Sequence, residues 1–263
     1  MWQEEKPEDK KLFQWAKTGY NTYNMMLEQG KIGGTEVKFL IDDADITKIR
    51  EIYEYYPVDG VTTNPSILAK AGGSPQEVLR EIRSFIGQEA DLHVQVVSRK
   101  AEAMAAEAQI IREALGERTY IKVPVVPEGL KAIRMLSAEG YLITATAIYT
   151  PMQAFLAAKA GADFAAPYVN RIDNLGADGV ETAKTIHDMF VKNNCKTEVL
   201  AASFKNARQV SELCRYGVGG VTVGADLIKS FLQNDSVTAA VDAFCADFEG
   251  LCGKEKTMSD IFL

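Results

Sequence analysis

The sequence predicts an α/β protein whose core is a closed (β/α)8 TIM barrel. From residue 37 onward, short runs rich in β-branched and aromatic residues alternate with stretches in which apolar residues recur at helical spacing. Eight such pairs follow one another, and eight parallel strands close naturally into a barrel. The 263 residues also suit one barrel. An open doubly wound sheet is the alternative, but no G-x-G-x-x-G follows the first strand.

The eight runs are predicted as strands because Val, Ile, Phe, Tyr and Thr are frequent in them. In order, they are VKFLID (37–42), DGVTT (59–63), LHVQVV (92–97), YIKVPV (120–125), YLITATAI (141–148), DFAAPYV (163–169), EVLAAS (198–203) and GVTVG (220–224). Helical spacing predicts one helix after each strand, near 45–55, 75–87, 99–115, 128–139, 151–160, 178–193, 206–216 and 225–233. This alternation is typical of βαβ units.

Two segments lie outside the eight pairs, so the chain divides into three parts. Residues 1–36 form an N-terminal extension, in which Pro7 and Gly30 bracket a helical pattern. Residues 37–234 form the barrel, and residues 235–263 form a C-terminal helix and tail. The apolar residues of that ninth helix share one face, at spacings of four and three: Val237, Val241, Phe244, Phe248 and Leu251.

The ninth helix also predicts a homo-oligomer. The eight barrel helices are already placed, and an additional apolar face needs a partner. The alternative is that residues 236–252 fold back over their own barrel.

Composition excludes several classes of function. The net charge is −7 and the pI is about 5.1, which disfavours nucleic acid as a partner. No apolar run reaches the roughly 18 residues of a membrane helix. The first residues, MWQEEKPEDKK, lack the apolar segment of a signal peptide, and the four cysteines form no C-x-x-C pair, as expected of a cytoplasmic protein. Two histidines and no clustered cysteine leave little material for a metal site.

Polar residues recur near the carboxyl ends of the predicted strands, at positions that face the barrel interior. Catalysis in such barrels takes place at this end. Seven strands supply such residues: Asp42, Thr62 with Asn64, Gln95 with His93 one layer deeper, Lys122, Thr146 with Thr144 beneath it, Tyr168, and Ser203. A merely structural barrel would fill these positions with Val, Ile or Leu. Their convergence predicts a polar pocket, although each residue alone also has a structural explanation.

Lys122 stands in the middle of the apolar run TYIKVPVV. A buried ammonium is costly unless it is paired or functional, so a lysine that reaches water is the structural alternative. If Lys122 faces the pocket, it is either a cation that binds an anion or a nucleophilic amine. Burial lowers the pKa of a lysine, and a neutral amine in a confined site attacks carbonyl groups to form a Schiff base. Asp42 is then a plausible acceptor for substrate hydroxyl groups.

Four motifs carry a resemblance to a known family. GVTTNPSI (60–67), IKVPV (121–125) with EGL (128–130), APYVNRID (166–173) and LAASFK (200–205) together resemble the small transaldolase and fructose-6-phosphate aldolase family, over residues 37–253. The resemblance implies a class I aldolase barrel without metal or cofactor, a sugar-phosphate substrate, and a Schiff-base lysine at Lys122. It also implies rings in which the last helix reaches a neighbouring subunit, as pentamers or decamers.

The resemblance assigns further roles position by position. Asp42 and Asn64 match residues that hold substrate hydroxyl groups. Gln95, Thr146 and Tyr168 match the group that positions a catalytic water, with Tyr168 as acid and base. The residues that match the phosphate-binding end are Arg171, Ser203 and Lys205, the last in a place where transaldolases commonly have arginine.

Three functions remain open. The first is an aldolase that cleaves or forms fructose 6-phosphate and releases dihydroxyacetone. The second is a transaldolase, which passes the three-carbon unit to an aldose phosphate. Typical transaldolases carry glutamate where Gln95 stands and phenylalanine where Tyr168 stands, so these two residues favour the aldolase. The third, a catalytically silent sugar-phosphate-binding barrel, is disfavoured by the intact set of Lys122, Asp42, Asn64 and Tyr168.

Overall fold

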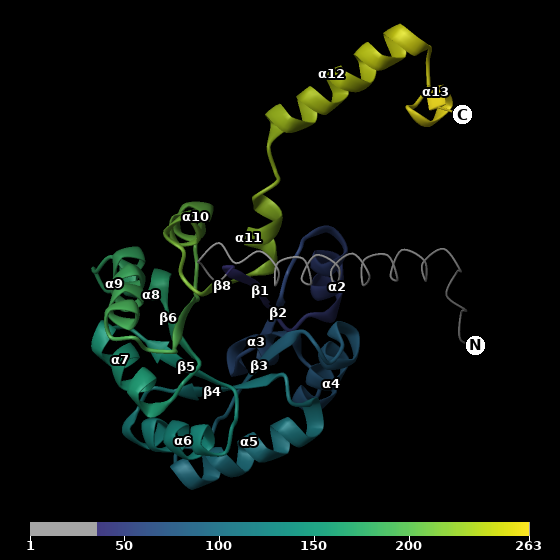
Figure 1. The fold of residues 1–263 in the computed structure, drawn as a ribbon. Helices are drawn as coiled ribbons and strands as arrows, with labels where there is room; N and C mark the ends of the chain where they lie inside the picture. The colour runs from purple at the N-terminus through teal and green to yellow at the C-terminus, as the bar shows by residue number, and fades with distance from the viewer. Residues whose placement is uncertain (1–35, 263) are drawn as a thin grey trace, which may run out of the picture. The chain divides into compact units, whose positions relative to one another are not determined.

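The computed structural model describes residues 36–262 and contains the predicted barrel. Eight parallel strands close in the order β1 to β8, with β8 paired to β1. The helices form a ring around the strands (Figure 1). The (β/α)8 fold is therefore confirmed, and the open doubly wound alternative is wrong. The predicted N-terminal extension lies outside the described residues.

The strands lie where the sequence predicts them, but several are shorter. They are β1 (Lys38–Asp42), β2 (Gly60–Thr62), β3 (Asp91–Gln95), β4 (Thr119–Pro124), β5 (Ile143–Ile148), β6 (Phe164–Pro167), β7 (Glu198–Ala201) and β8 (Gly220–Val223). Tyr168 and Ser203 thus lie just beyond β6 and β7, in the segments where barrel enzymes carry their functional groups.

All eight predicted barrel helices are present. They are α2 (Ile46–Tyr55), α4 (Pro75–Ile86), α5 (Ala101–Leu115), α6 (Pro127–Ala138), α7 (Pro151–Ala160), α9 (Gly179–Lys192), α10 (Ala207–Tyr216) and α11 (Ala225–Ser230). Side-chain caps start many of them: Asp45, Thr150, Asp178 and Asn206 each accept a hydrogen bond from a backbone N–H of the first turn.

Two short helices that the sequence reading missed follow β2 and β6. α3 (Pro65–Ala71) begins with Asn64 as its N-cap and proline in its first position, a recognisable start signal. α8 (Val169–Asn174) begins after Tyr168, which makes no side-chain cap, so no comparable signal announced it. Both helices adjoin the carboxyl ends of their strands and therefore the predicted pocket.

Side chains fill the barrel interior toward the amino-terminal ends of the strands, so the predicted pocket does not lie there. Leu40, Tyr120, Phe164 and Leu200 form a separate apolar cluster inside the ring of strands. Beneath it, the buried carboxylate of Asp91 forms ion pairs with Lys38 and Arg118. The larger apolar core lies between the strands and the helices, with Ile41, Ile121, Val123 and Ile143 completely buried.

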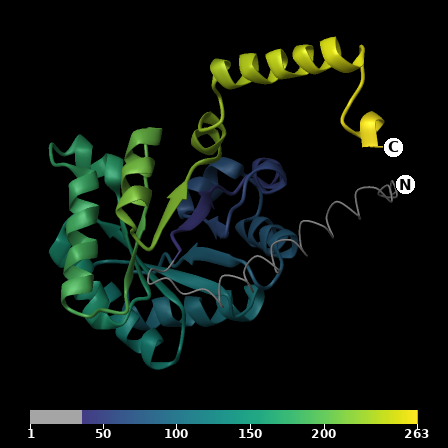
Figure 2. The same ribbon diagram turned by 45° about the horizontal axis from the view of Figure 1, so that its top comes forward.

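The C-terminal part contains α12 (Asp235–Cys252) and α13 (Ser259–Phe262), at the yellow end of the ribbon in Figures 1 and 2. No residue of α12 is buried, and Phe244 and Leu251 are 70% and 82% exposed. The fold-back alternative for this helix is therefore not what the structure shows. Within residues 36–262, no helix is both long and apolar enough to cross a membrane.

Candidate active site

Lys122 faces the interior of the barrel and is almost completely buried. It lies in the middle of β4, where its side chain is 6% exposed, and its Nζ donates a hydrogen bond to the carbonyl oxygen of Thr63 at 2.7 Å. Its chain neighbours Ile121 and Val123 point the other way, into the core beneath the helices. The alternative in which Lys122 reaches open water is therefore wrong.

Burial dominates the electrostatics of Lys122. Loss of hydration lowers the pKa of its ammonium group, and the carboxylate of Asp42 opposes this by raising it. Asp42 is on β1, three strands away from Lys122 around the ring. Among the described residues, no carboxylate lies within ion-pair distance of Lys122. The amine is therefore more available as a nucleophile than an ordinary lysine at the same pH.

The neighbours of Lys122 on the adjacent strands are polar. Gln95, the last residue of β3, is paired in register with Lys122, and Thr144 of β5 is its partner on the other side. The end of β4 is held by α6: a Cβ on Gly129 would lie 1.9 Å from the carbonyl oxygen of Pro124, so glycine permits this close approach. The EGL motif thus supports the strand that carries the lysine.

Asp42 ends a short chain of hydroxyl groups. Thr62 donates to a carboxylate oxygen of Asp42 at 2.7 Å, and its own hydroxyl lies 2.6 Å from that of Thr222 on β8. Because Thr62 gives its proton to Asp42, it accepts the proton of Thr222. Burial raises the pKa of Asp42, whereas the charge of Lys122 and the bond from Thr62 lower it.

Tyr168 lies in a cluster of polar and aromatic groups. Its hydroxyl is 2.9 Å from that of Thr146, which is completely buried near the end of β5. The guanidinium carbon of Arg171 lies 4.5 Å from the centroid of the Tyr168 ring, a cation–π contact, and Tyr149 packs edge-on at 5.7 Å. Three of the predicted site residues are thus brought together here: Thr146, Tyr168 and Arg171.

The remaining predicted residues lie in loops at the same end of the barrel. Asn64 caps α3 by accepting from the backbone N–H groups of Ser66 and Ile67, which leaves its amide nitrogen as a donor. Ser203 adopts a left-handed backbone with φ of 62°, a strained conformation for a residue with a side chain. Lys205 is exposed, and its backbone N–H donates to Gln209.

His93 is a hydrogen-bonded core residue, one layer deeper than Gln95. It is completely buried, its Nδ1 lies 2.9 Å from the hydroxyl of Thr144, and its ring stacks on Tyr120 with 4.4 Å between centroids. Burial lowers its pKa well below the usual range, so His93 is neutral near pH 7. Among the described residues, no three His, Cys, Asp or Glu side chains gather as they would around a metal ion.

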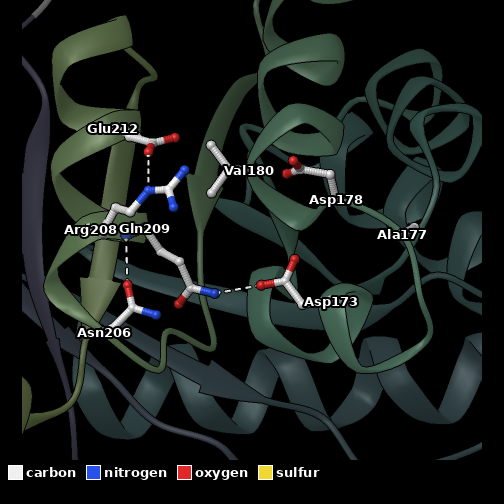
Figure 3. Close-up of a pocket in the computed structure, with 8 residues that line it drawn as sticks. All are labelled: Asp173, Ala177, Asp178, Val180, Asn206, Arg208, Gln209 and Glu212. Atoms are coloured by element: carbon white, nitrogen blue, oxygen red, sulfur yellow. Dashed lines mark hydrogen bonds and ion pairs between the residues drawn. The ribbon is translucent and has the colours of Figure 1, made fainter.

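A surface hollow of about 360 Å³ lies outside this polar cluster, between α8, α9 and α10 (Figure 3). Asp173, Gln209 and Glu212 are among the residues that line it, and none of the predicted site residues does. The hollow is therefore a neighbour of the candidate site and not the site itself.

Sequence reasoning did not identify several contacts of this site. Thr222 occupies an inward position of GVTVG and supplies the polar group of the eighth strand, so the period-two pattern contained a signal for it. The Thr63 carbonyl that accepts from Lys122 carried no signal, since every residue has such an oxygen. A nucleophilic amine, a carboxylate and a phenol at one barrel mouth can together add to a carbonyl group and move its protons.

Comparisons with known proteins find similar sequences over most of the chain. A family model described as Transaldolase/Fructose-6-phosphate aldolase matches residues 39–260. A protein of Streptococcus pneumoniae (strain ATCC 700669 / Spain 23F-1), named probable fructose-6-phosphate aldolase, is 42% identical over 214 residues. That alignment covers 81% of this chain and 96% of the relative.

Proposed function

The chain belongs to the transaldolase/fructose-6-phosphate aldolase family, and we propose that it is a class I aldolase acting on fructose 6-phosphate. It cleaves this sugar phosphate to dihydroxyacetone and glyceraldehyde 3-phosphate, and forms it in reverse, through a Schiff base on Lys122. The observation that carries the proposal is the lysine itself, a buried amine with a lowered pKa at the carboxyl-terminal mouth of the barrel. The reaction requires no resident metal or cofactor.

The first step is addition of the neutral amine of Lys122 to the C2 ketone. Loss of water from the resulting carbinolamine gives an iminium ion. A base then removes the proton of the C4 hydroxyl, the C3–C4 bond breaks, and its electron pair passes to the iminium as an enamine. Glyceraldehyde 3-phosphate leaves as the aldehyde. Protonation of the enamine at C3 and hydrolysis of the iminium release dihydroxyacetone and regenerate the amine.

Tyr168 is the proposed acid and base, acting through a water molecule that Gln95 and Thr146 help to hold. The hydrogen bond between Tyr168 and Thr146 supports this assignment, because it orients the phenol. Gln95 can bind a water but cannot accept its proton as a carboxylate would. Asp42 accepts hydrogen bonds from substrate hydroxyl groups, and Asn64 donates with its amide nitrogen.

Arg171, Ser203 and Lys205 are proposed to bind the substrate phosphate. Arg171 and Lys205 supply positive charge on exposed side chains, and Ser203 supplies a hydroxyl. All three follow β6 or β7, so they come from two adjacent segments at the carboxyl-terminal end of the barrel.

Transaldolase is the second candidate, and it differs only in the fate of the enamine. A transaldolase would pass the three-carbon unit from Lys122 to an acceptor such as erythrose 4-phosphate. Gln95 and Tyr168 favour the aldolase, as does the name of the pneumococcal relative.

One assay separates the two candidates. Purified protein is incubated with fructose 6-phosphate, and free dihydroxyacetone is measured with and without erythrose 4-phosphate. An aldolase releases dihydroxyacetone without the acceptor. A protein that transfers much faster than it releases is a transaldolase, and one that does neither refutes both assignments and leaves a binding protein.

A further inference from the structure

Hydrogen bonds attach both ends of α8, the helix that carries Arg171, to neighbouring segments. At its start, the backbone N–H groups of Val169 and Asn170 donate to the carbonyl oxygens of Ala202 and Ser203, at 2.9 and 2.8 Å. These bonds join α8 to the loop after β7. Near the end of α8, the carboxylate of Asp173 provides a second attachment, which involves side chains.

Asp173 uses both of its carboxylate oxygens. Oδ1 accepts from the backbone N–H of Gly179, the first residue of α9, at 2.7 Å. Oδ2 accepts from the amide nitrogen of Gln209 in α10 at 2.6 Å, as Figure 3 shows. One carboxylate thus connects three helices at this edge of the barrel. A hydrogen bond to a charged acceptor is stronger than one between neutral groups.

Gln209 completes the connection to the loop after β7. Its side-chain oxygen accepts from the backbone N–H of Lys205 at 2.8 Å, while its amide nitrogen donates to Asp173. The side chain is 7% exposed and belongs to the same buried face as Val210 and Leu213, where an apolar residue would ordinarily pack. A buried amide with both ends bonded holds two segments at a defined separation.

We propose that Gln209 is a positioning residue for phosphate recognition, and that it sets the separation between Arg171 on α8 and the Ser203–Lys205 loop. The proposal rests on the function proposed above, in which these residues bind the substrate phosphate. Gln209 does not touch the reacting atoms, so its effect is confined to substrates that carry a phosphate. The position of α8 relative to this loop determines whether Arg171 and Lys205 can both contact the substrate phosphate.

The test compares two acceptor aldehydes in the synthetic direction. Dihydroxyacetone is the donor, and KM is measured for glyceraldehyde 3-phosphate and for glyceraldehyde, which lacks the phosphate. Gln209→Leu keeps the approximate volume and removes both hydrogen bonds. It should raise KM for glyceraldehyde 3-phosphate about tenfold, the effect of losing one charge-assisted hydrogen bond, and leave KM for glyceraldehyde and both kcat values unchanged.

A reciprocal exchange distinguishes the hydrogen bond from general packing. Gln209→Glu alone places two carboxylates against each other and should weaken binding of the phosphorylated acceptor. The double variant Gln209→Glu with Asp173→Asn reverses the direction of the bond. The amide now at position 173 donates to the carboxylate now at position 209, and the hydrogen bonds from the backbone N–H groups of Lys205 and Gly179 are kept. The double variant should recover most of the wild-type KM. Glu212→Gln is the matched control: Glu212 lines the same hollow, but its hydrogen bond and ion pair within residues 36–262 are to Arg208 on its own helix.

Two outcomes overturn the inference while leaving the aldolase assignment intact. One is a Gln209→Leu variant whose KM changes equally, or not at all, for the two acceptors. The other is a double variant that binds the phosphorylated acceptor no better than Gln209→Glu does. If Gln209→Leu does not fold, this second comparison tests the role of Gln209 by itself. Wild-type protein that uses neither acceptor would instead refute the proposed function, and this inference with it.

Discussion

Tyr168→Phe removes one oxygen atom from the candidate site and little else. The phenylalanine ring can keep the contact with the Arg171 guanidinium at 4.5 Å and the edge contact with Tyr149 at 5.7 Å. The hydroxyl pair with Thr146, at 2.9 Å, is the contact among the described residues that is lost. The variant therefore separates the proton-transfer role of Tyr168 from its packing.

The expected loss of activity is much larger than the expected loss of stability. General acid–base groups contribute about 10²-fold or more to a rate, so cleavage of fructose 6-phosphate should fall by at least that factor, or about 2.7 kcal/mol of barrier. The buried hydroxyl of Thr146 loses its partner, which costs about 1 kcal/mol and lowers Tm by about 2–4 °C in a domain of this size.

The assay follows formation of glyceraldehyde 3-phosphate from fructose 6-phosphate and, separately, borohydride trapping of dihydroxyacetone on Lys122. Trapping should survive in Tyr168→Phe, because the amine is intact. Tyr149→Phe is the control and should retain cleavage, since it removes a hydroxyl that has no proposed role. If Tyr168→Phe cleaves at the wild-type rate, proton transfer belongs to another residue.

Adding Gln95→Glu to Tyr168→Phe should restore proton transfer, because the new carboxylate can act as a base. The double variant should also pass more of the three-carbon unit to erythrose 4-phosphate, relative to the dihydroxyacetone it releases.

The remaining predictions concern Lys122, the effect of chelators and the oligomeric state. Lys122→Met should abolish turnover while the protein stays folded, and borohydride with dihydroxyacetone should add a three-carbon mass to Lys122 of the wild type; a label elsewhere would refute the Schiff base. Because burial lowers the pKa of Lys122, trapping should rise with pH through a midpoint below 10.5. Asp42→Asn should move that midpoint lower still, since the carboxylate raises this pKa, and an upward shift would contradict the coupling. Chelators should leave turnover unchanged, and a loss reversed by metal would count against the mechanism. Light scattering should show a homo-oligomer, because α12 exposes apolar side chains along its length; a monomer of 28.9 kDa at micromolar concentration would exclude this.

The sequence alone determined the barrel and the residues that point into it. Strand and helix periods are local properties, so eight alternations could be counted directly, and a period of two identified Asp42, Gln95, Lys122 and Thr146 as inward residues. An ammonium in the middle of an apolar strand was informative because burial of an unpaired charge is costly.

Contacts between distant segments were decided only by the tertiary structure. Lys122 donates to Thr63 across 59 positions of the chain, Thr62 meets Thr222 across 160, and Gln209 bonds Asp173 across 36. These pairings depend on the stagger of the strands and on how α8 and α10 dock beside them. The stagger of a closed barrel and the docking of its helices follow from packing of the whole molecule, and no local period records them.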